Sequence, residues 1–272
     1  KGDLILFDEL CHASIRDGIQ LSNAKSYKFK HNDFEDLEKL ILKNTSNENE
    51  IFIVTESVFS MDGDIAKLDQ ICDLADKYDA LVMTDECHSA GFIGKTGRGV
   101  PEYCNVMNRV DIITGTLGKA LGGAMGGYTT GKKEIIEILR QRSRPYLFSN
   151  SLAPSIVGAA NKVFEILSST TELRDKLEEN TKYFKEKIIA AGFDIKPGDS
   201  PIVPIMLYDA ALSQQFADML LEEGVYAIGF FYPVVAKGQA RIRTQISAAH
   251  TKAHLDKAID AFIRIGKDMG VI

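Results

Sequence analysis

The chain has 272 residues, of which 45% are hydrophobic and 26% are charged, and this composition is ordinary for a globular protein of about two domains. The formal net charge of −6 provides no basic surface for nucleic acid, and no apolar run approaches the roughly 20 residues that cross a membrane. The four cysteines show neither disulfide nor zinc-ligand spacing, so we expect a reduced, cytoplasmic protein without a metal centre.

The first half of the chain alternates apolar strands with amphipathic helices. The run at 51–55 is continuously apolar and β-branched, which indicates a strand covered on both faces. This alternation predicts an α/β fold with a mostly parallel sheet. We predict strands at 3–7, 24–29, 51–55, 80–84, 110–114 and 124–128. We predict helices at 15–21, 33–42 (with Asp33 as N-cap), 68–78 and 132–139, and a loop at 43–50.

The second half changes to a different pattern. Two long helices, at 155–167 and 172–191, precede a small α+β unit. We therefore predict a large domain at 1–153 and a small C-terminal α+β domain at 154–272. In the small domain we predict strands at 202–207, 225–229 and 240–246 and helices at 211–223 and 251–269.

The stretch from Thr114 to Gly127 places one lysine, Lys119, among glycines with no acid beside it. Glycine lets the backbone approach a ligand closely, and a partly desolvated lysine away from carboxylates is a nucleophile for a carbonyl. The alternative is a solvated loop lysine, since most lysines are exposed. A phosphate-binding loop is excluded, because that motif requires glycine where Ile113 stands and Ser or Thr where Ala120 stands.

Polar residues follow the predicted buried strands. Ser60, Asp85 and Thr116 each lie just past the end of one strand. In open α/β sheets the ligand crevice lies outside these carboxyl ends, so we expect the three residues to line one pocket. On the strand at 240–246, Arg241 and Arg243 share a face, and one of them suits a substrate carboxylate; a surface ion pair is the alternative.

Other chemistries lack their signatures. Neither Cys11-His12 nor Cys87-His88 has zinc-ligand spacing, and the nucleophile elbow and the dinucleotide-binding fingerprint are both missing. Three arginines within 140–144 suit an anionic ligand, a subunit boundary or a solvated basic face. A pyridoxal phosphate (PLP) site, by contrast, has its lysine, its acid and its hydroxyls.

Several motifs occur in order along the chain: 57–64, Asp85-Glu-Cys-His88, 91–94 with 97–99, Thr116-Leu-Gly-Lys119-Ala, 140–154, 229–235 and 238–245. In order and spacing they resemble the α-oxoamine synthases, PLP enzymes of the aspartate-aminotransferase fold. The resemblance runs through the whole chain but covers only the middle and end of a family-length protein. We therefore expect a piece of a longer protein or a poorly stable fragment, without the N-terminal Gly-rich turn that meets the PLP phosphate.

The resemblance implies a role for each matching residue. Lys119 would hold PLP covalently and then act as acid and base, and Asp85 would pair with the pyridine nitrogen. The other cofactor and substrate roles fall on His12 (ring stacking, also substrate), Ser60 and His88 (phenolic oxygen), Thr116 (phosphate), Ser149 and Asn150 (the neighbouring subunit's cofactor) and Arg243 (amino-acid carboxylate).

The resemblance also implies an activity and partners. The motifs at 140–154, 229–235 and 238–245 favour condensation of glycine with acetyl-CoA to 2-amino-3-oxobutanoate, by a homodimer with shared sites that partners threonine dehydrogenase. The alternatives are the family's 5-aminolevulinate, 8-amino-7-oxononanoate and serine palmitoyl enzymes, or a non-catalytic PLP-binding subunit. Glu86 and Cys87 depart from the Asp with Ser or Ala that we expect there, and no direct role is expected for either.

Overall fold

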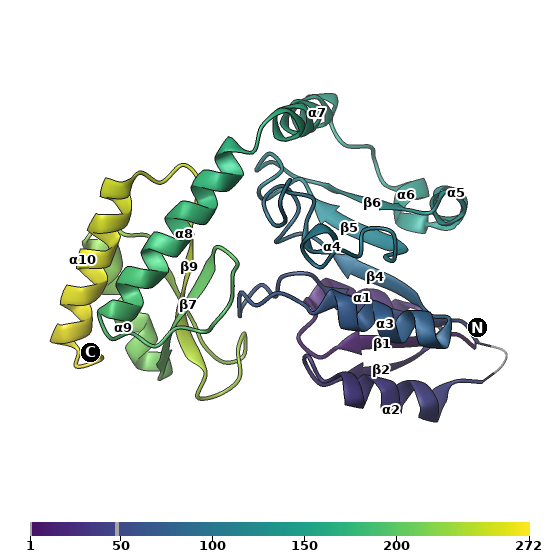
Figure 1. The fold of residues 1–272 in the computed structure, drawn as a ribbon, viewed down its shortest axis with the longest axis horizontal. Helices are drawn as coiled ribbons and strands as arrows, with labels where there is room; N and C mark the ends of the chain where they lie inside the picture. Colours follow the sequence, from purple (N-terminus) through teal and green to yellow (C-terminus); the bar gives the residue numbers. More distant parts are fainter. Residues whose placement is uncertain (1, 47–48) are drawn as a thin grey trace. The chain divides into compact units, whose positions relative to one another are not determined.

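The structure is a computed structural model that describes residues 2–46 and 49–272 (Figure 1). The chain forms two compact units, one of residues 1–59 and 65–171 and the other of residues 60–64 and 172–272. Helix α7 (Pro154–Ser169) falls within the first unit, and the domain division after residue 153 stays a prediction. Within the described part of the chain, no helix is both long and apolar enough to span a bilayer.

The first unit contains a six-stranded sheet in the order β2-β1-β3-β4-β5-β6. All neighbouring pairs are parallel except β5 with β6, so the predicted α/β fold with a mostly parallel sheet is confirmed. The strands are β1 (Leu4–Asp8), β2 (Lys25–Phe29), β3 (Ile51–Glu56), β4 (Leu81–Asp85), β5 (Ile112–Thr116) and β6 (Gly127–Gly131). The strand predicted at 124–128 begins three residues later, because Gly126 still belongs to a turn in which its carbonyl accepts from Leu117 N–H.

The helices of the first unit follow the predicted pattern with two additions. Asp33 caps α2 as predicted, since its side chain accepts the N–H of Asp36 at 2.9 Å. The short helices α4 and α6 were not predicted; each is at most five residues long and has proline in its first turn. The bounds are α1 (Ala13–Leu21), α2 (Phe34–Asn44), α3 (Leu68–Tyr78), α4 (Val100–Tyr103), α5 (Lys133–Arg142) and α6 (Arg144–Phe148).

The second unit packs three helices with an antiparallel sheet in the order β7-β9-β8. Its core is aromatic: Phe184, Phe216 and Phe262 are at most 2% exposed. Strand β8 begins three residues after the predicted position, because Val225 N–H closes the end of α9 by donating to Leu220. The elements are α8 (Glu172–Ala190), β7 (Ile202–Tyr208), α9 (Ala210–Glu222), β8 (Ile228–Phe230), β9 (Ala240–Gln245) and α10 (Lys252–Asp268).

Candidate active site

The carboxyl ends of four parallel strands meet at one edge of the first unit's sheet. Strands β1, β3, β4 and β5 end there at Asp8, Glu56, Asp85 and Thr116. The register pairs Asp85 with Glu56 on one side and with Thr114 on the other. Asp85 and Thr116 therefore lie at the same edge, as their positions after buried strands predicted.

Hydrogen bonds between the two ends of the loop after β5 fix the loop, which carries Lys119. Leu117 N–H donates to Gly126 at 2.9 Å, and Ala124 N–H donates to Leu117 at 3.1 Å. Leu117 and Leu121 are buried with Ala160 of α7 in a small apolar cluster. These contacts fix the backbone on both sides of Lys119, whose own side chain is exposed rather than partly desolvated as we expected.

Lys119 lies beside a histidine. Its Nζ is 3.1 Å from Nε2 of His88, in the turn that follows β4. No carboxylate lies within ion-pair distance of Lys119 in residues 2–46 and 49–272. One of the two nitrogens must accept the hydrogen bond, and which one does so depends on the tautomer of His88.

Thr116 turns its side chain back onto the same loop. Its hydroxyl accepts the N–H of Gly118 at 3.0 Å and donates to the carbonyl of Gly126 at 3.2 Å. Thr116 is half-buried. The Thr116 hydroxyl therefore lies at the start of this loop, three residues before Lys119 in the sequence.

Asp85 is held by the backbone around it. Its Oδ1 accepts the N–H of Cys87 at 2.8 Å, and its carbonyl accepts the hydroxyl of Ser57 at 2.8 Å. Burial, together with the neighbouring Asp85 carboxylate, raises the pKa of the Cys87 thiol to about 12. Cys87 is therefore a thiol at neutral pH and a poor nucleophile.

His12 begins α1. Its Nδ1 accepts the N–H of Ser14 at 3.2 Å and thereby caps the helix. The ring is exposed. The loop that leads to His12 starts at Asp8, at the end of β1, so the position of this histidine depends on how that loop is held.

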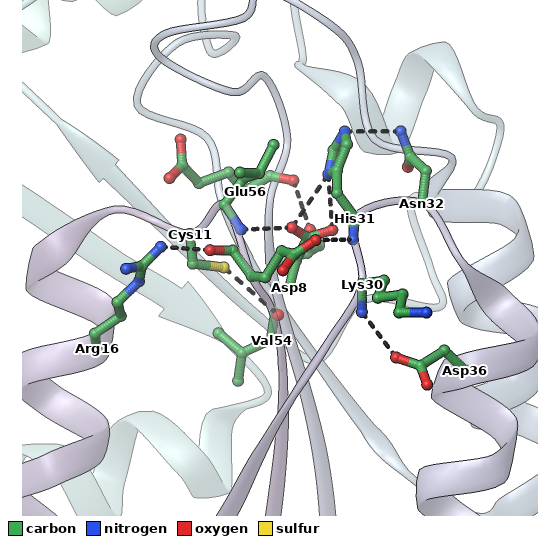
Figure 2. Close-up of polar contacts among 12 residues, drawn as sticks. Asp8, Cys11, Arg16, Lys30, His31, Asn32, Asp36, Val54 and Glu56 are labelled. Atoms are coloured by element: carbon green, nitrogen blue, oxygen red, sulfur yellow. Dashed lines mark hydrogen bonds and ion pairs between the residues drawn. The ribbon is translucent and has the colours of Figure 1, made fainter. Parts of the chain in front are cut away.

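Asp8 and His31 form a hydrogen-bonded clasp at the start of this loop, in which Asp8 is buried and His31 is half-buried (Figure 2). Asp8 is 2% exposed, and its carboxylate lies 3.0 Å from Nδ1 of His31 and accepts the N–H of Leu10 at 2.8 Å. The His31 ring packs edge-on against Phe59, with centroids 4.4 Å apart. The sequence pattern does not reveal this pair, because its members are 23 residues apart and share no motif.

Ser60 and Arg243 belong to the second unit. Arg243 lies on β9, and among the described residues its buried Nε has no hydrogen-bond partner. Burial lowers the pKa of this guanidinium from its ordinary value. Arg241 differs: it is 2% exposed, and its Nη1 donates to Asp62 at 2.8 Å and to the carbonyl of Met61 at 3.0 Å. Of the two arginines, Arg243 is thus the one with a buried donor left for a ligand.

Ser149 and Asn150 follow α6 and are exposed. Ser149 ends this helix with its N–H donating to the carbonyl of Pro145 at 3.1 Å. Neither residue is brought to the carboxyl edge by any contact found in the described part of the chain. Their assignment to a neighbouring subunit's cofactor stays a prediction.

A family model for aminotransferase class I and II matches residues 1–262. This chain belongs to the class I and II aminotransferase family. Among curated members, it is 58% identical over 271 residues to 2-amino-3-ketobutyrate coenzyme A ligase of Escherichia coli K12, covering 99% of this chain and 68% of that protein. The human mitochondrial protein of that name is 49% identical over 270 residues, covering 99% of this chain and 64% of the relative.

Other members carry different names. An 8-amino-7-oxononanoate synthase of Thermosipho melanesiensis is 49% identical over 270 residues, covering 99% of this chain and 68% of that protein. The structure superimposes on Sphingomonas wittichii serine palmitoyltransferase with a TM-score of 0.96 at 34% identity, covering all of this chain and 68% of that one. A serine palmitoyltransferase from S. paucimobilis, solved with a PLP–myriocin aldimine, gives 0.95 at 35% identity with the same coverage.

Proposed function

We propose that this protein is a PLP-dependent glycine C-acetyltransferase, also called 2-amino-3-ketobutyrate CoA ligase. The observation that carries the proposal is the amine of Lys119 beside His88, at the sheet edge that also holds Asp85 and Thr116. The 58% identity to the Escherichia coli enzyme of that name supports the choice of reaction.

The residues at this edge fit PLP by their chemistry. A primary amine free of carboxylate partners suits an aldehyde, a carboxylate suits a pyridinium nitrogen, and a half-buried hydroxyl at a Gly-rich loop suits a phosphate. Lys119, Asp85 and Thr116 supply these groups, with His88, His12 and Ser60 as further cofactor residues. Bound there, PLP would supply a carbonyl for the amino group of glycine and an electron-withdrawing ring for the charge left at its Cα.

The chain's own residues then have distinct tasks. The carboxylate of Asp85 would hold a proton at the ring nitrogen and so preserve the ring's ability to withdraw electrons. Lys119 would take the proton from Cα of glycine as general base, while Arg243 would bind the glycine carboxylate through parallel N–H donors. His88 would donate a hydrogen bond to the ring's phenolic oxygen and is within reach of the Lys119 amine.

The overall reaction is a Claisen-type condensation. The Cα of glycine forms a bond to the carbonyl carbon of acetyl-CoA, the C–S bond breaks, and CoA leaves with the product 2-amino-3-oxobutanoate. We further propose a homodimer with shared sites, in which Ser149 and Asn150 reach the neighbouring cofactor. A cytoplasmic location is supported by the four free cysteines, and threonine dehydrogenase is the proposed metabolic partner.

Thiol release from acetyl-CoA by the purified, PLP-loaded protein, with and without glycine, tests the proposal. Glycine-dependent release that exceeds release from succinyl-CoA and palmitoyl-CoA supports it. Preference for a longer acyl-CoA would instead favour the 8-amino-7-oxononanoate or serine palmitoyl enzymes. Absence of a borohydride-reducible adduct on Lys119 would contradict PLP binding through this lysine.

A further inference from the structure

In the sequence, Glu86 lies between Asp85, the last residue of β4, and His88, both of which have roles in the proposed reaction. It is only 2% exposed, although it is a carboxylic acid. Such a group is costly to bury unless its oxygens are satisfied by donors. Each of its carboxyl oxygens accepts a hydrogen bond, and the donors come from different segments.

The side chain joins β4, the turn after it and a distant loop. Oε1 accepts the hydroxyl of Thr84 at 3.2 Å. Oε2 accepts the N–H of Val100 at 3.0 Å and a short hydrogen bond from the hydroxyl of Ser89. Val100 is the first residue of α4, so Glu86 ties the end of the Gly-rich loop at 91–99 back to the sheet.

The backbone of Glu86 continues the same network. Its N–H donates to the carbonyl of Thr114 on β5 at 2.8 Å, and its carbonyl accepts the N–H groups of Ser89 at 3.1 Å and Ala90 at 3.0 Å. These contacts define the turn that carries His88. The network also reaches Asp85, because the hydroxyl of Ser57 donates to its carbonyl and contacts the hydroxyl of Ser89, both at 2.8 Å.

We propose that Glu86 is a positioning residue, which fixes the turn at 85–89 so that Asp85 and His88 face the cofactor and Lys119. This inference rests on the proposed function, because the tasks of Asp85 and His88 come from it. Glu86 touches no reacting atom in the proposal. It acts through the donors it holds, which come from three separate segments of the chain.

The state of the carboxyl group points to a conservative test. Burial raises the pKa of Glu86 to about 7, although the hydrogen bonds from Ser89, Val100 and Thr84 lower it in part. A neutral carboxyl group is therefore well populated near pH 7, and glutamine has nearly the same shape. Glu86→Gln keeps one oxygen for Ser89 and Val100, and its amide can donate to the hydroxyl of Thr84. Glu86→Ala removes all three contacts.

Glu102 provides a matched control. It is also a glutamate in the same loop region, and its carboxylate accepts the N–H of Thr96 at 2.9 Å, the hydroxyl of Thr96 at 2.7 Å and the N–H of Arg98 at 3.1 Å. Glu102 holds the outer part of the loop, and in the described part of the chain it makes no hydrogen bond or ion pair with the turn at 85–89. Glu102→Ala therefore leaves three donors without their acceptor, as Glu86→Ala does, but away from that turn.

The experiment compares the wild type, Glu86→Gln, Glu86→Ala, Ser89→Ala and Glu102→Ala with PLP bound. We measure the PLP dissociation constant, the visible circular dichroism of bound PLP, and kcat and KM for glycine. We expect Glu86→Ala to weaken PLP binding, change the dichroism and lower kcat at least about tenfold with little change in KM for glycine. Glu86→Gln should stay within about threefold of the wild type, and Glu102→Ala should match it.

Three results would overturn the positioning role. The first is that Glu86→Ala keeps the kcat, PLP affinity and dichroism of the wild type. The second is that Glu86→Ala and Glu102→Ala lose kcat and PLP affinity to the same extent. If Glu86→Ala does not fold, Ser89→Ala provides the test, because it removes one donor to Glu86 and should change the dichroism of bound PLP. The third result that would overturn the role is an unchanged spectrum in Ser89→Ala. Failure of the proposed function is separate: the wild type would then release no thiol with glycine, while the PLP affinities and spectra still rank the variants.

Discussion

Replacing Asp62 with alanine tests how the segment at 60–64 is held in the second unit. The Asp62 carboxylate pairs with Arg241 at 2.8 Å and with Lys196 by a short contact. The side chain of Arg241 is 3% exposed, whereas that of Lys196 is 33% exposed. Alanine would therefore leave a buried guanidinium without its counter-charge, and a lysine that can turn toward water.

The expected loss of stability follows from this difference in exposure between Arg241 and Lys196. Breaking a buried ion pair by removing one partner costs about 3–5 kcal/mol. Arg241 keeps two contacts, to the carbonyls of Gln239 at 2.9 Å and Met61 at 3.0 Å, and Lys196 can be rehydrated. We therefore expect a loss near the lower end, about 3 kcal/mol in the free energy of unfolding of the second unit.

Urea unfolding and amide hydrogen exchange at residues 60–64 and 240–245 measure this loss. The matched control is Glu35→Ala, which breaks an exposed pair with Lys39 and should change neither measurement detectably. Burial opposes ionisation of Asp62, but hydrogen bonds from Lys196 and Arg241 prevail and lower its pKa. The difference between wild type and variant should thus be full above the ordinary carboxyl pKa of about 3.9 and shrink as the pH falls below it. A loss no larger than that of Glu35→Ala would refute the reasoning.

Three further substitutions test the site and the fold. Lys119→Ala should lower glycine-dependent thiol release by at least about 10²–10⁴-fold, because it removes a general base and the covalent attachment; near-normal turnover would reject the mechanism. Arg243→Lys should raise KM for glycine about tenfold, since a point charge replaces a two-pronged donor, and an unchanged KM would count against that role. Gly63→Ala should lower the melting temperature, because φ is +73° and the new Cβ would lie 2.5 Å from the carbonyl oxygen of Ile202. Gly158→Ala, with nothing within 4 Å, is its control, and equal melting temperatures would contradict the strain argument.

Periodicity predicted the elements that bury a continuous apolar face. The strands from β1 to β5 and the helix capped by Asp33 were all located to within about two residues. Except in β2, which is exposed at four of its five positions, burial on both faces or on one stripe leaves a regular pattern in the sequence. Helices α4 and α6 escaped prediction because five residues or fewer cannot show a 3.6-residue period. Their only local signal was proline in the first turn, at Pro101 and Pro145, which is also common in loops.

The candidate site divides along similar lines. Lys119, Asp85 and Thr116 could be found because each follows a strand whose pattern is visible, and parallel strands bring their carboxyl ends to one edge. The approach of His88 to Lys119 could not, since it depends on the exact course of two loops 31 residues apart. The same holds for the Asp8–His31 clasp and for the donors gathered by Glu86, where the partners are set by tertiary packing.

Arg241 and Arg243 show where sequence reasoning reaches its physical limit. They are two residues apart on β9 and project to the same face, so the alternation of side chains along the strand cannot distinguish them. Their chemistry differs because of what other segments supply: Asp62 neutralises Arg241, whereas Arg243 lies across the strand from Pro204 and Ile228 and 5.8 Å from the Phe230 ring. Arg243 is half-buried and keeps a buried Nε without a hydrogen-bond partner among the described residues, so it is the better candidate to bind an anionic substrate.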